Sequence, residues 1–220
     1  KIKKRQFLVG FALETQNELE NAKTKLKKKN LVFSVPSGNF GNICAGIIAM
    51  KLGLPIDHFV ASTNVNDTIP RYFKSKVLSP KPTIQTISNA MDVSNPSNFI
   101  RIQEMFENFD TLSSFLSSYS FDDYQTLEIV KEIYNNKNYI MDPHGAVGYL
   151  GLKKYLKNKP NKIGVFLETA HPIKFSKHIE NTIDVKLKIP KKINKILSKN
   201  KKYIDIENYN DFKKKILNMY

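Results

Sequence analysis

The sequence has no tryptophan, one cysteine and no long apolar run, and each absence argues against a class of protein. A membrane-spanning helix needs roughly 20 consecutive apolar residues, so we expect no membrane partner. The apolar part of the N-terminal stretch "KIKKRQFLVGF" is too short for a signal peptide, and Glu14 ends it without a cleavage site. The single thiol of Cys44 can form neither an internal disulfide nor a multi-cysteine metal site, which fits a cytoplasmic protein.

The four histidines are scattered, at positions 58, 144, 171 and 178. Their spacing is not that of a zinc site, so we predict no bound metal. For His144 and His171, a structural role with hydrogen bonds to neighbouring groups is the more frequent one. The sequence around His58 and His178 indicates no function.

Positive charge dominates the sequence, which carries a net charge of +15 that comes almost entirely from lysine. Such an excess raises the possibility of a nucleic-acid partner. However, the lysines are spread over the whole chain, and no basic-aromatic module accompanies them. We therefore favour solvated helix faces over a nucleic-acid site. An apolar content of 41% and a charged content of 25% are typical of a soluble globular domain.

Apolar patterns of strand and helix type alternate along the chain. We predict strands at 7–11, 32–35, 58–63 and 162–168. We predict helices at 14–29, 42–53, 96–109, 122–136, 145–156 and 172–183, with a last short helix at 210–220. Ser97 is the expected N-cap of the helix at 96–109. The segment 64–75 is polar and a proline-rich loop follows it. This alternation predicts an α/β fold with a mostly parallel sheet and flanking helices.

The stretch "SVPSGNFGNICAG" (34–46) joins a predicted strand to a predicted helix through two glycines and two asparagines. Glycines let backbone N–H groups approach an anion, and the helix N-terminus adds partial positive charge. Ser37 and Asn39 are candidate side-chain donors. The loop has no Lys or Arg, so it is not a Walker-type phosphate loop. The spacing alone leaves an anion site and an ordinary tight turn equally open.

A second stretch, "LETAHPIKF" (167–175), again runs from a strand through a polar turn into a helix. In a parallel sheet, Thr169 and His171 would lie on the same edge as the glycine loop. A hydroxyl at this position could exchange a hydrogen bond with a heterocycle nitrogen. This second stretch favours a ligand site over a simple turn.

Five motifs occur in the order "VPSGNFGN", "STNVNDTIPRYF", "SNAMDVSNPSNFIR", "DPHGAVGYLGL" and "ETAHPIKF". Together they make residues 32–220 resemble the C-terminal half of threonine synthase. That family consists of pyridoxal 5'-phosphate enzymes with the fold type II, or tryptophan-synthase-β-like, architecture. The resemblance implies a lyase of threonine biosynthesis that converts O-phospho-L-homoserine and water to L-threonine and phosphate.

The resemblance also implies roles for individual residues. Those expected to bind the cofactor are Ser37, Gly38, Asn39, Phe40 and Gly41 at its phosphate and Thr169 near its pyridine nitrogen. Those expected on the substrate side are Asn64, Asp67, Arg71, Ser88, Asn89 and Arg101. For Arg71 and Arg101, surface ion pairs are an equally good interpretation.

The catalytic lysine of the family, which forms a Schiff base with the cofactor, lies in the N-terminal half in a Phe-Lys-Asp context. This sequence contains no such motif. The resemblance therefore implies no catalytic residue in this chain and no turnover by the chain alone. A separate chain that supplies the missing half is a conceivable partner.

Residues 1–31 resemble a different family, the phosphopantothenoylcysteine synthetase part of the bifunctional coenzyme A biosynthesis protein. The resemblance implies one strand-helix unit of a Rossmann-like, CTP-binding domain. We therefore expect a boundary between Leu31 and Val32, with a threonine-synthase-like domain from 32 to 220. Two alternatives stay open, namely a remnant of a CTP-dependent ligase fusion and a non-enzymatic phosphate-binding module.

Overall fold

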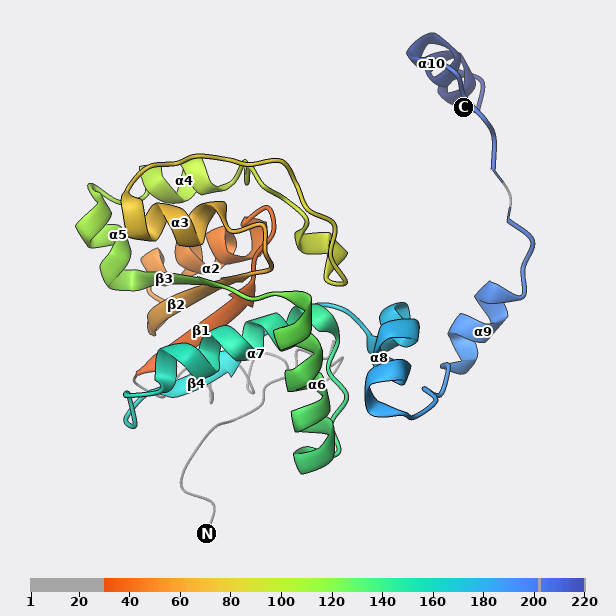
Figure 1. Cartoon of the computed structure of the whole chain (residues 1–220). Coiled ribbons are helices and arrows are strands. Elements are labelled where there is room, and N and C mark those ends of the chain that lie inside the picture. Colours follow the sequence, from red (N-terminus) through yellow and green to blue (C-terminus); the bar gives the residue numbers. More distant parts are fainter. Residues whose placement is uncertain (1–29, 202, 220) are drawn as a thin grey trace. The chain divides into compact units, whose positions relative to one another are not determined.

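A computed structural model describes residues 30–201 and 203–219 of the chain (Figure 1). The strand predicted at 7–11 and the helix predicted at 14–29 lie outside the described residues. The chain divides into two units, with the boundary between Lys186 and Leu187.

The first unit is built on a sheet of four parallel strands, in the order β3-β2-β1-β4. The strands are β1 (Leu31–Pro36), β2 (Ile56–Thr63), β3 (Leu116–Ser120) and β4 (Ile163–Phe166). The predicted parallel sheet is therefore confirmed. The chain builds outward from β1 to β3 on one side and adds β4 on the other. The carboxyl end of β1 is thus the point where the winding direction changes, which is where α/β sheets bind ligands.

Helices cover both faces of the sheet (Figure 1). The helices of the first unit are α2 (Gly41–Lys51), α3 (Thr68–Ser75), α4 (Phe99–Glu104), α5 (Phe109–Phe115), α6 (Asp123–Lys137), α7 (Pro143–Leu156) and α8 (Ser176–Ile183). Short 3-10 turns form η1 (Asn89–Met91) and η2 (Pro172–Phe175). The second unit contains α9 (Lys191–Leu197) and α10 (Tyr209–Leu217). No helix of the described residues is long and apolar enough to span a membrane.

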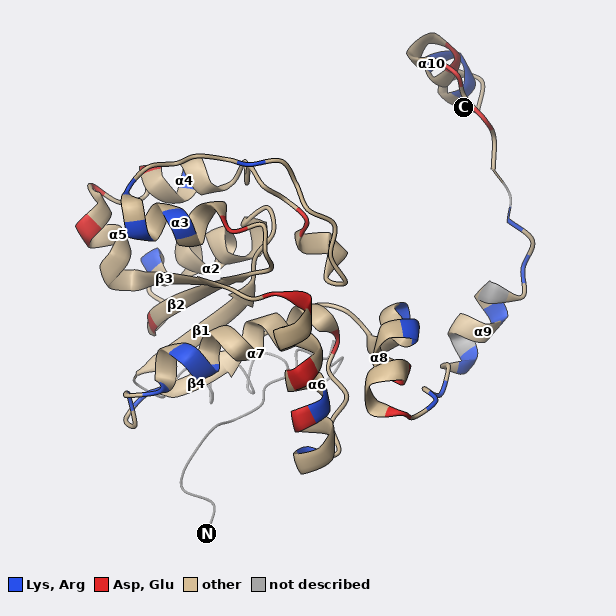
Figure 2. Cartoon of the chain, viewed as in Figure 1, with Lys and Arg blue, Asp and Glu red and all other residues tan. Residues whose placement is uncertain are grey.

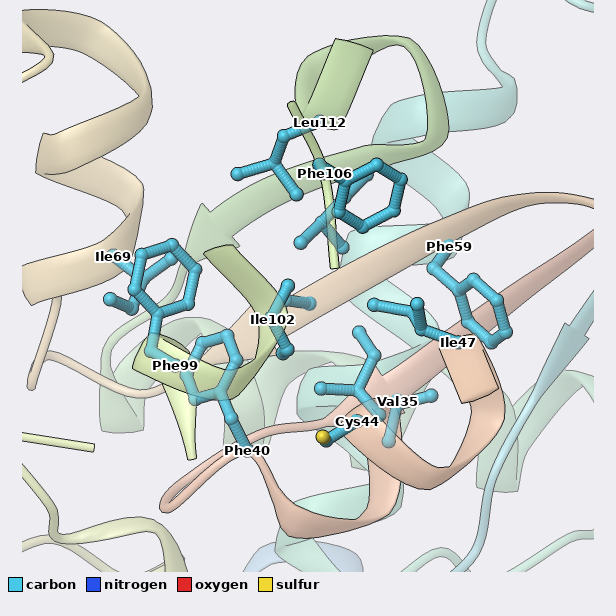
Figure 3. Packing of buried hydrophobic residues seen from close by; sticks show 13 residues of the cluster. Val35, Phe40, Cys44, Ile47, Phe59, Ile69, Phe99, Ile102, Phe106 and Leu112 are labelled. Atoms are coloured by element: carbon cyan, nitrogen blue, oxygen red, sulfur yellow. The ribbon is translucent and has the colours of Figure 1, made fainter. Parts of the chain in front are cut away.

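One face of the sheet packs on α2, α4 and α5 through the main apolar core (Figure 3). Side chains alternate along a strand, so Val35 of β1 and Phe59 and Ala61 of β2 point into this core. Ile43 and Ile47 of α2 meet them and are fully buried. This packing fixes the start of α2 against the end of β1.

The other face of the sheet packs closely on α7. Glycine recurs at every third position of α7, as Gly145, Gly148 and Gly151. This spacing places the glycines along one face of the helix, and all three are buried. A Cβ added at Gly151 would lie 1.9 Å from the Ser62 hydroxyl, and one at Gly148 would lie 3.3 Å from the Pro36 ring. The Ser34 hydroxyl donates to the Gly148 carbonyl across 2.6 Å. The glycines therefore let α7 lie against the strands, with its N-terminus at their carboxyl ends.

Two predicted elements differ in the structure. The helix predicted at 96–109 is the shorter α4, with a second helix, α5, that begins at Phe109, and the residue before α4 is Asn98 rather than Ser97. The reason is that the Ser97 N–H and hydroxyl both donate to Asn39, while Asn108 accepts from Thr111 N–H and starts a new helix. The helix predicted at 172–183 likewise begins as the 3-10 turn η2 before it continues as α8.

Three elements are absent from the prediction, namely α3, β3 and α9. Pro70 suggests a turn in the α3 sequence, but it lies in the first helical turn, where proline is tolerated. The strand β3 has the serine-rich sequence LSSYS, and its Ser118 hydroxyl donates to the Ala61 carbonyl. Pairing with β2, rather than an apolar pattern, makes this segment a strand.

Lysine and arginine residues are distributed over many elements (Figure 2). They occur on α3, α6, α7 and α8 of the first unit and on α9 and α10 of the second. This distribution agrees with the interpretation of the lysine clusters as solvated helix faces.

His58 gives the fold a testable pH dependence. Its Nδ1 lies 3.1 Å from the Ser114 carbonyl, its Nε2 lies 2.9 Å from the Ser117 hydroxyl, and its ring stacks on Tyr155. Burial lowers the pKa of His58 to about 4, although the Ser114 carbonyl opposes this shift. The unfolded state therefore binds more protons than the folded state below the ordinary histidine pKa. Stability contributed by neutral His58 is present above that pKa and is lost as the pH falls toward 4.

We expect the free energy of unfolding to fall by about 2 kcal/mol between roughly pH 7 and pH 5 through His58 alone. Urea unfolding of the wild-type chain and of the His58→Gln variant, which does not titrate, isolates this contribution. Parallel pH profiles for the two proteins would contradict the assignment of a buried, neutral His58.

Candidate functional site

The loop between β1 and α2 leaves a run of backbone donors free. The Ser37 N–H donates to the Ser62 carbonyl at 2.8 Å, and the first helical bond of α2 runs from Cys44 N–H to the Phe40 carbonyl at 3.0 Å. Between these two bonds, no described residue accepts a hydrogen bond from the N–H groups of residues 38–43. Free N–H groups at the N-terminus of an 11-residue helix form a site for an anion.

A cavity of about 400 Å³ opens on these donors. Residues 36–43 line one part of it, and Ala90, Met91, Asn98, His144 and Thr169 line the rest. This volume lies within the range of small-molecule sites. The described lining residues include no Lys, Arg, Asp or Glu. An anion here would be held by backbone dipoles, as expected from a loop without basic residues.

Gly38 is where the loop touches the opposite wall. A Cβ at this position would lie 2.7 Å from the Met91 Cα and 2.8 Å from the Ala90 carbonyl oxygen. Real Cβ atoms do not approach backbone this closely. Only glycine therefore lets η1 pack against the loop, so Gly38 sets the width of the cavity here.

Phe40 ends the loop in the left-handed region, with φ 61°. That conformation is costly for a residue with a Cβ. The Phe40 ring is 3% exposed and meets the Phe99 ring edge-on, with 5.7 Å between centroids. Burial of the ring offsets the backbone cost and fixes the turn that aims the N–H groups into the cavity.

The side chains of Ser37 and Asn39 shape the loop. The Ser37 hydroxyl donates to the Val35 carbonyl at 2.8 Å. The Asn39 side-chain oxygen accepts from both the N–H and the hydroxyl of Ser97, and Asn98 donates to the Asn39 carbonyl at 2.9 Å. The loop therefore presents its main chain to the cavity, with these side chains bracing it from behind.

Thr169 and His171 follow β4 but have different surroundings. Thr169 is exposed and lines the cavity together with the glycine loop, so the structure brings these two predicted parts of the site together. His171 is exposed and lies outside the lining, and its Nδ1 accepts from the Ile173 N–H to cap η2. His171 thus has the structural role that is usual for a lone histidine.

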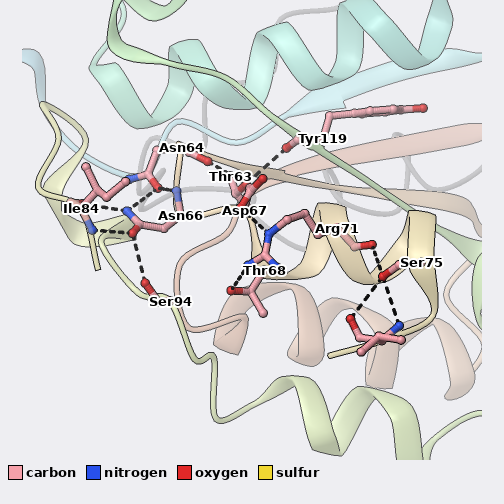
Figure 4. A network of polar contacts seen from close by, with 11 residues as sticks. Thr63, Asn64, Asn66, Asp67, Thr68, Arg71, Ser75, Ile84, Ser94 and Tyr119 are labelled. Atoms are coloured by element: carbon pink, nitrogen blue, oxygen red, sulfur yellow. Dashed lines mark hydrogen bonds and ion pairs between the residues drawn. The ribbon is translucent and has the colours of Figure 1, made fainter. Parts of the chain in front are cut away.

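None of the six predicted substrate residues lines the cavity. Asn64 and Ser88 are buried, whereas Asn89 and Arg101 are exposed. Arg71 Nε donates to Asp67 at 2.8 Å, which is the ion pair considered as an alternative for this arginine (Figure 4). Arg101 donates to the side chain of Asn98, which does line the cavity, at 2.7 Å.

Asn64 belongs to a polar network that holds the segment before η1 (Figure 4). Its amide nitrogen donates to Asp92 at 2.8 Å and to Thr86 at 2.9 Å. Asp92 also accepts from the Thr86 hydroxyl and backbone N–H. Because Asp92 directly follows η1, these bonds tie the cavity wall to the carboxyl end of β2.

Three acidic and basic residues near the cavity were not predicted to have a shared role, namely Asp142, His144 and Glu168. His144 Nδ1 lies 2.7 Å from Asp142, and its Nε2 accepts from the Ala90 N–H at 3.2 Å. Asp142 also caps α7 through the N–H of His144 at 2.9 Å. The sequence signal was Asp-Pro-His, an N-cap residue followed by proline at the first helical position.

The two carboxyl groups of this cluster have pKa values that are shifted in opposite directions. Burial acts to raise the pKa of Asp142, but hydrogen bonds, chiefly those with His144, outweigh it and lower the pKa. Burial and the adjacent Asp142 carboxylate raise the pKa of Glu168 strongly. The opposite directions favour the ionised form at Asp142 and the neutral form at Glu168, because two neighbouring carboxylates repel each other.

Two family models match this chain. Residues 145–216 match "Threonine synthase, C-terminal", and residues 1–37 match "DNA/pantothenate metabolism flavoprotein C-terminal domain". Threonine synthase of Haemophilus influenzae is 47% identical over 171 residues, which are 78% of this chain and 40% of that protein. Threonine synthase of Escherichia coli is 43% identical over 166 residues, 76% of this chain and 38% of that protein.

Solved structures agree with these matches. The crystal structure of threonine synthase from Escherichia coli has a TM-score of 0.78 and 37% identity, and covers 89% of this chain and 45% of that one. A PLP-bound threonine synthase from Brucella melitensis has a TM-score of 0.76 and 25% identity, and covers 88% of this chain and 46% of that one.

The fold with its switch-point loop is that of the PLP enzymes of fold type II. Within that class, the chain resembles the C-terminal part of the threonine synthases, as its five motifs predicted. It spans about 40% of the length of the curated relatives it matches. The N-terminal resemblance is also supported, and its match reaches residue 37, beyond the predicted boundary after Leu31. The position of that boundary stays a prediction.

Phe40 allows a test of the strained loop. Phe40→Ala removes the buried ring but keeps a Cβ in the left-handed region, and we expect it to lower the free energy of unfolding by about 3–5 kcal/mol. Phe40→Gly loses the same ring yet relieves the backbone, so it should be more stable than the alanine variant by about 1 kcal/mol. Urea unfolding of both variants measures the difference. A glycine variant that is less stable than the alanine variant would show that the backbone carries no strain.

Proposed function

We propose that this chain supplies the phosphate-binding part of a threonine-synthase-like active site, which takes pyridoxal 5'-phosphate as cofactor and O-phospho-L-homoserine as substrate. The single observation that carries the proposal is the run of free N–H groups at residues 38–43, at the N-terminus of α2 and on a cavity of about 400 Å³. The similarity to threonine synthases supports the phosphate group of pyridoxal 5'-phosphate as the anion that binds there.

The residues present fit the cofactor. Its phosphate would sit on the free backbone N–H groups that begin at Gly38, since the N–H and hydroxyl of Ser37 bond within the protein, and dipoles rather than side-chain cations would balance the charge. Thr169, which lines the cavity, would offer its neutral hydroxyl to the pyridine nitrogen. Such a partner, unlike a carboxylate, would leave that nitrogen unprotonated. When bound, the cofactor supplies an electron sink for charge that develops on the substrate.

The substrate side has fewer contacts in this chain. Among the six predicted residues, Arg101 is linked to the cavity by a hydrogen bond that it donates to the lining residue Asn98. Its guanidinium keeps donors that could bind a carboxylate or phosphate. Asn89 is exposed on η1 beside the lining residue Ala90. Asn64 bonds Ser88 and Asp92 on either side of η1 and so supports the wall, whereas Asp67 and Arg71 pair with each other at the start of α3.

The reaction also needs an amine within bonding reach of the cofactor. The described lining residues include no lysine. We propose that the equivalent of the part of the relatives that this chain does not match provides that amine. As given, the chain then binds the cofactor without covalent attachment and does not turn over substrate.

A CTP-dependent ligase of coenzyme A biosynthesis is the second candidate, and the family match at residues 1–37 favours it. That match covers 37 residues, of which the structure describes only 30–37, including strand β1. The first candidate rests on a larger share of the chain. Binding of CTP in place of the pyridine cofactor would favour the second.

The first test uses pyridoxine 5'-phosphate, because this analogue lacks the aldehyde and cannot react with the many lysines. Titration calorimetry should detect its binding to the 220-residue chain, with pyridoxine at least about tenfold weaker because it cannot engage the free N–H groups. Gly38→Ala should weaken the phosphate ester by about tenfold or more, since the added Cβ displaces η1. Equal affinity for pyridoxine and its phosphate would contradict a phosphate site in this loop.

The second test is turnover. With pyridoxal 5'-phosphate and O-phospho-L-homoserine, the chain alone should release no inorganic phosphate above a heat-denatured control. Co-expression with the part of Haemophilus influenzae threonine synthase that this chain does not match should restore release if the two parts assemble. L-threonine formed by the chain alone would overturn the proposal that the amine comes from elsewhere.

A further inference from the structure

A row of hydrogen bonds, buried between Asp142 and His144 and partly buried at its two ends, links three elements around the cavity. It runs from Glu168 after β4, through Asp142 and His144 at the start of α7, to the Ala90 N–H of η1. We call these four residues the relay. Asp142 is fully buried and His144 is 3% exposed. The relay thus joins the strand end that carries Thr169 to the turn that packs against Gly38.

The hydrogen bonds fix the proton on His144. A backbone N–H can only donate, so Nε2 of His144 accepts from Ala90 and carries a lone pair. The proton of the neutral ring is therefore on Nδ1, where it is donated to Asp142 across 2.7 Å. Asp142 accepts in addition from the N–H groups of His144 and Gly145, which suits a carboxylate.

Glu168 closes the other end of the relay. The Asp142 N–H reaches its Oε2 at 3.5 Å, and its Oε1 is buried without a hydrogen-bond partner among the described residues. A Cβ at Gly145 would lie 2.4 Å from this carboxyl group, so the glycine makes room for it. The chain thus packs a carboxyl group tightly behind Asp142, one residue before the lining residue Thr169.

We propose that His144 is a positioning residue that holds η1 at the distance required by the bound phosphate ester. The inference rests on the function proposed above and adds a residue to it. Loss of the Nε2 acceptor frees the Ala90 N–H, and with it the Ala90–Met91 backbone that faces Gly38. The wall then opens, and the ligand loses contact on that side. Asp142 acts through His144 because it fixes the ring tautomer.

Two substitutions at His144 test the roles of its two ring nitrogens separately. In His144→Gln, the side-chain oxygen can take the place of Nε2 and accept from Ala90, while the bond to Asp142 is lost. In His144→Asn, the side-chain amide can still donate to Asp142 but is too short to reach Ala90. Both variants lose the ring contact with Phe175, which has 5.1 Å between centroids. The two variants therefore share the loss of the ring contact, and their difference sets the bond to Ala90 against the bond to Asp142.

The measurement is the affinity of the 220-residue chain for pyridoxine 5'-phosphate, together with urea unfolding of each variant. We expect His144→Asn to bind about tenfold more weakly than His144→Gln, and His144→Gln to stay near wild type. Equal affinities of the two variants, with the wild type still binding, would overturn the positioning role and leave the proposed function standing. A wild-type chain that does not bind the analogue overturns the proposed function and this inference with it.

A ligand-free readout tests the relay itself. Nitrogen-15 NMR of the wild-type chain should show His144 with its proton on Nδ1 and slow exchange of the Ala90 amide. His171, which is exposed and whose Nδ1 accepts from Ile173 N–H, is the internal comparison with the opposite tautomer. A His144 ring with its proton on Nε2 would contradict the relay whatever the ligand result.

Discussion

The site depends on one constraint, that the backbone N–H groups at the start of α2 find no acceptor in the described fold. A helix always leaves its first N–H groups unpaired, but here the preceding glycine loop adds more of them and the left-handed Phe40 turns them into one cavity. The ring of Phe40 in the core holds that turn in place. Phe40 therefore contributes both to the apolar core and to the shape of the cavity.

The close approach of α7 to the sheet determines the rest of the cavity. Glycines at every third position let the helix settle on Ser34, Pro36 and Ser62, which brings its N-terminus to the carboxyl ends of the strands. Asp142 and His144 are then in place to reach η1, while Asn64 and Asp92 hold η1 from the side of β2. Two polar networks thus support this wall, and Met91 of η1 also packs with Phe121 and Val147 in a small apolar cluster.

Sequence reasoning found the sheet, the switch-point loop and Thr169, because strong apolar strands and glycine spacing are local signals. It missed β3 and α3, since the first is a serine-rich segment made a strand by pairing and the second carries a proline in its first turn. It gave His144 a structural role with hydrogen bonds to neighbouring groups but did not name those groups. Ala90, the partner of His144, and Glu168, the partner of Asp142, are distant in sequence, and only the fold brings them together. The roles of the predicted substrate residues stay predictions.

The most direct test of the central claim follows the amide signals of the chain in nitrogen-proton NMR spectra during titration with pyridoxine 5'-phosphate. The account predicts that the largest shifts fall on the amides of residues 38–43, because those N–H groups gain the acceptor that they lack in the fold. Shifts concentrated on lysine-rich segments such as α9 and α10, with the loop amides unchanged, would show that the phosphate binds by surface charge and would contradict the account.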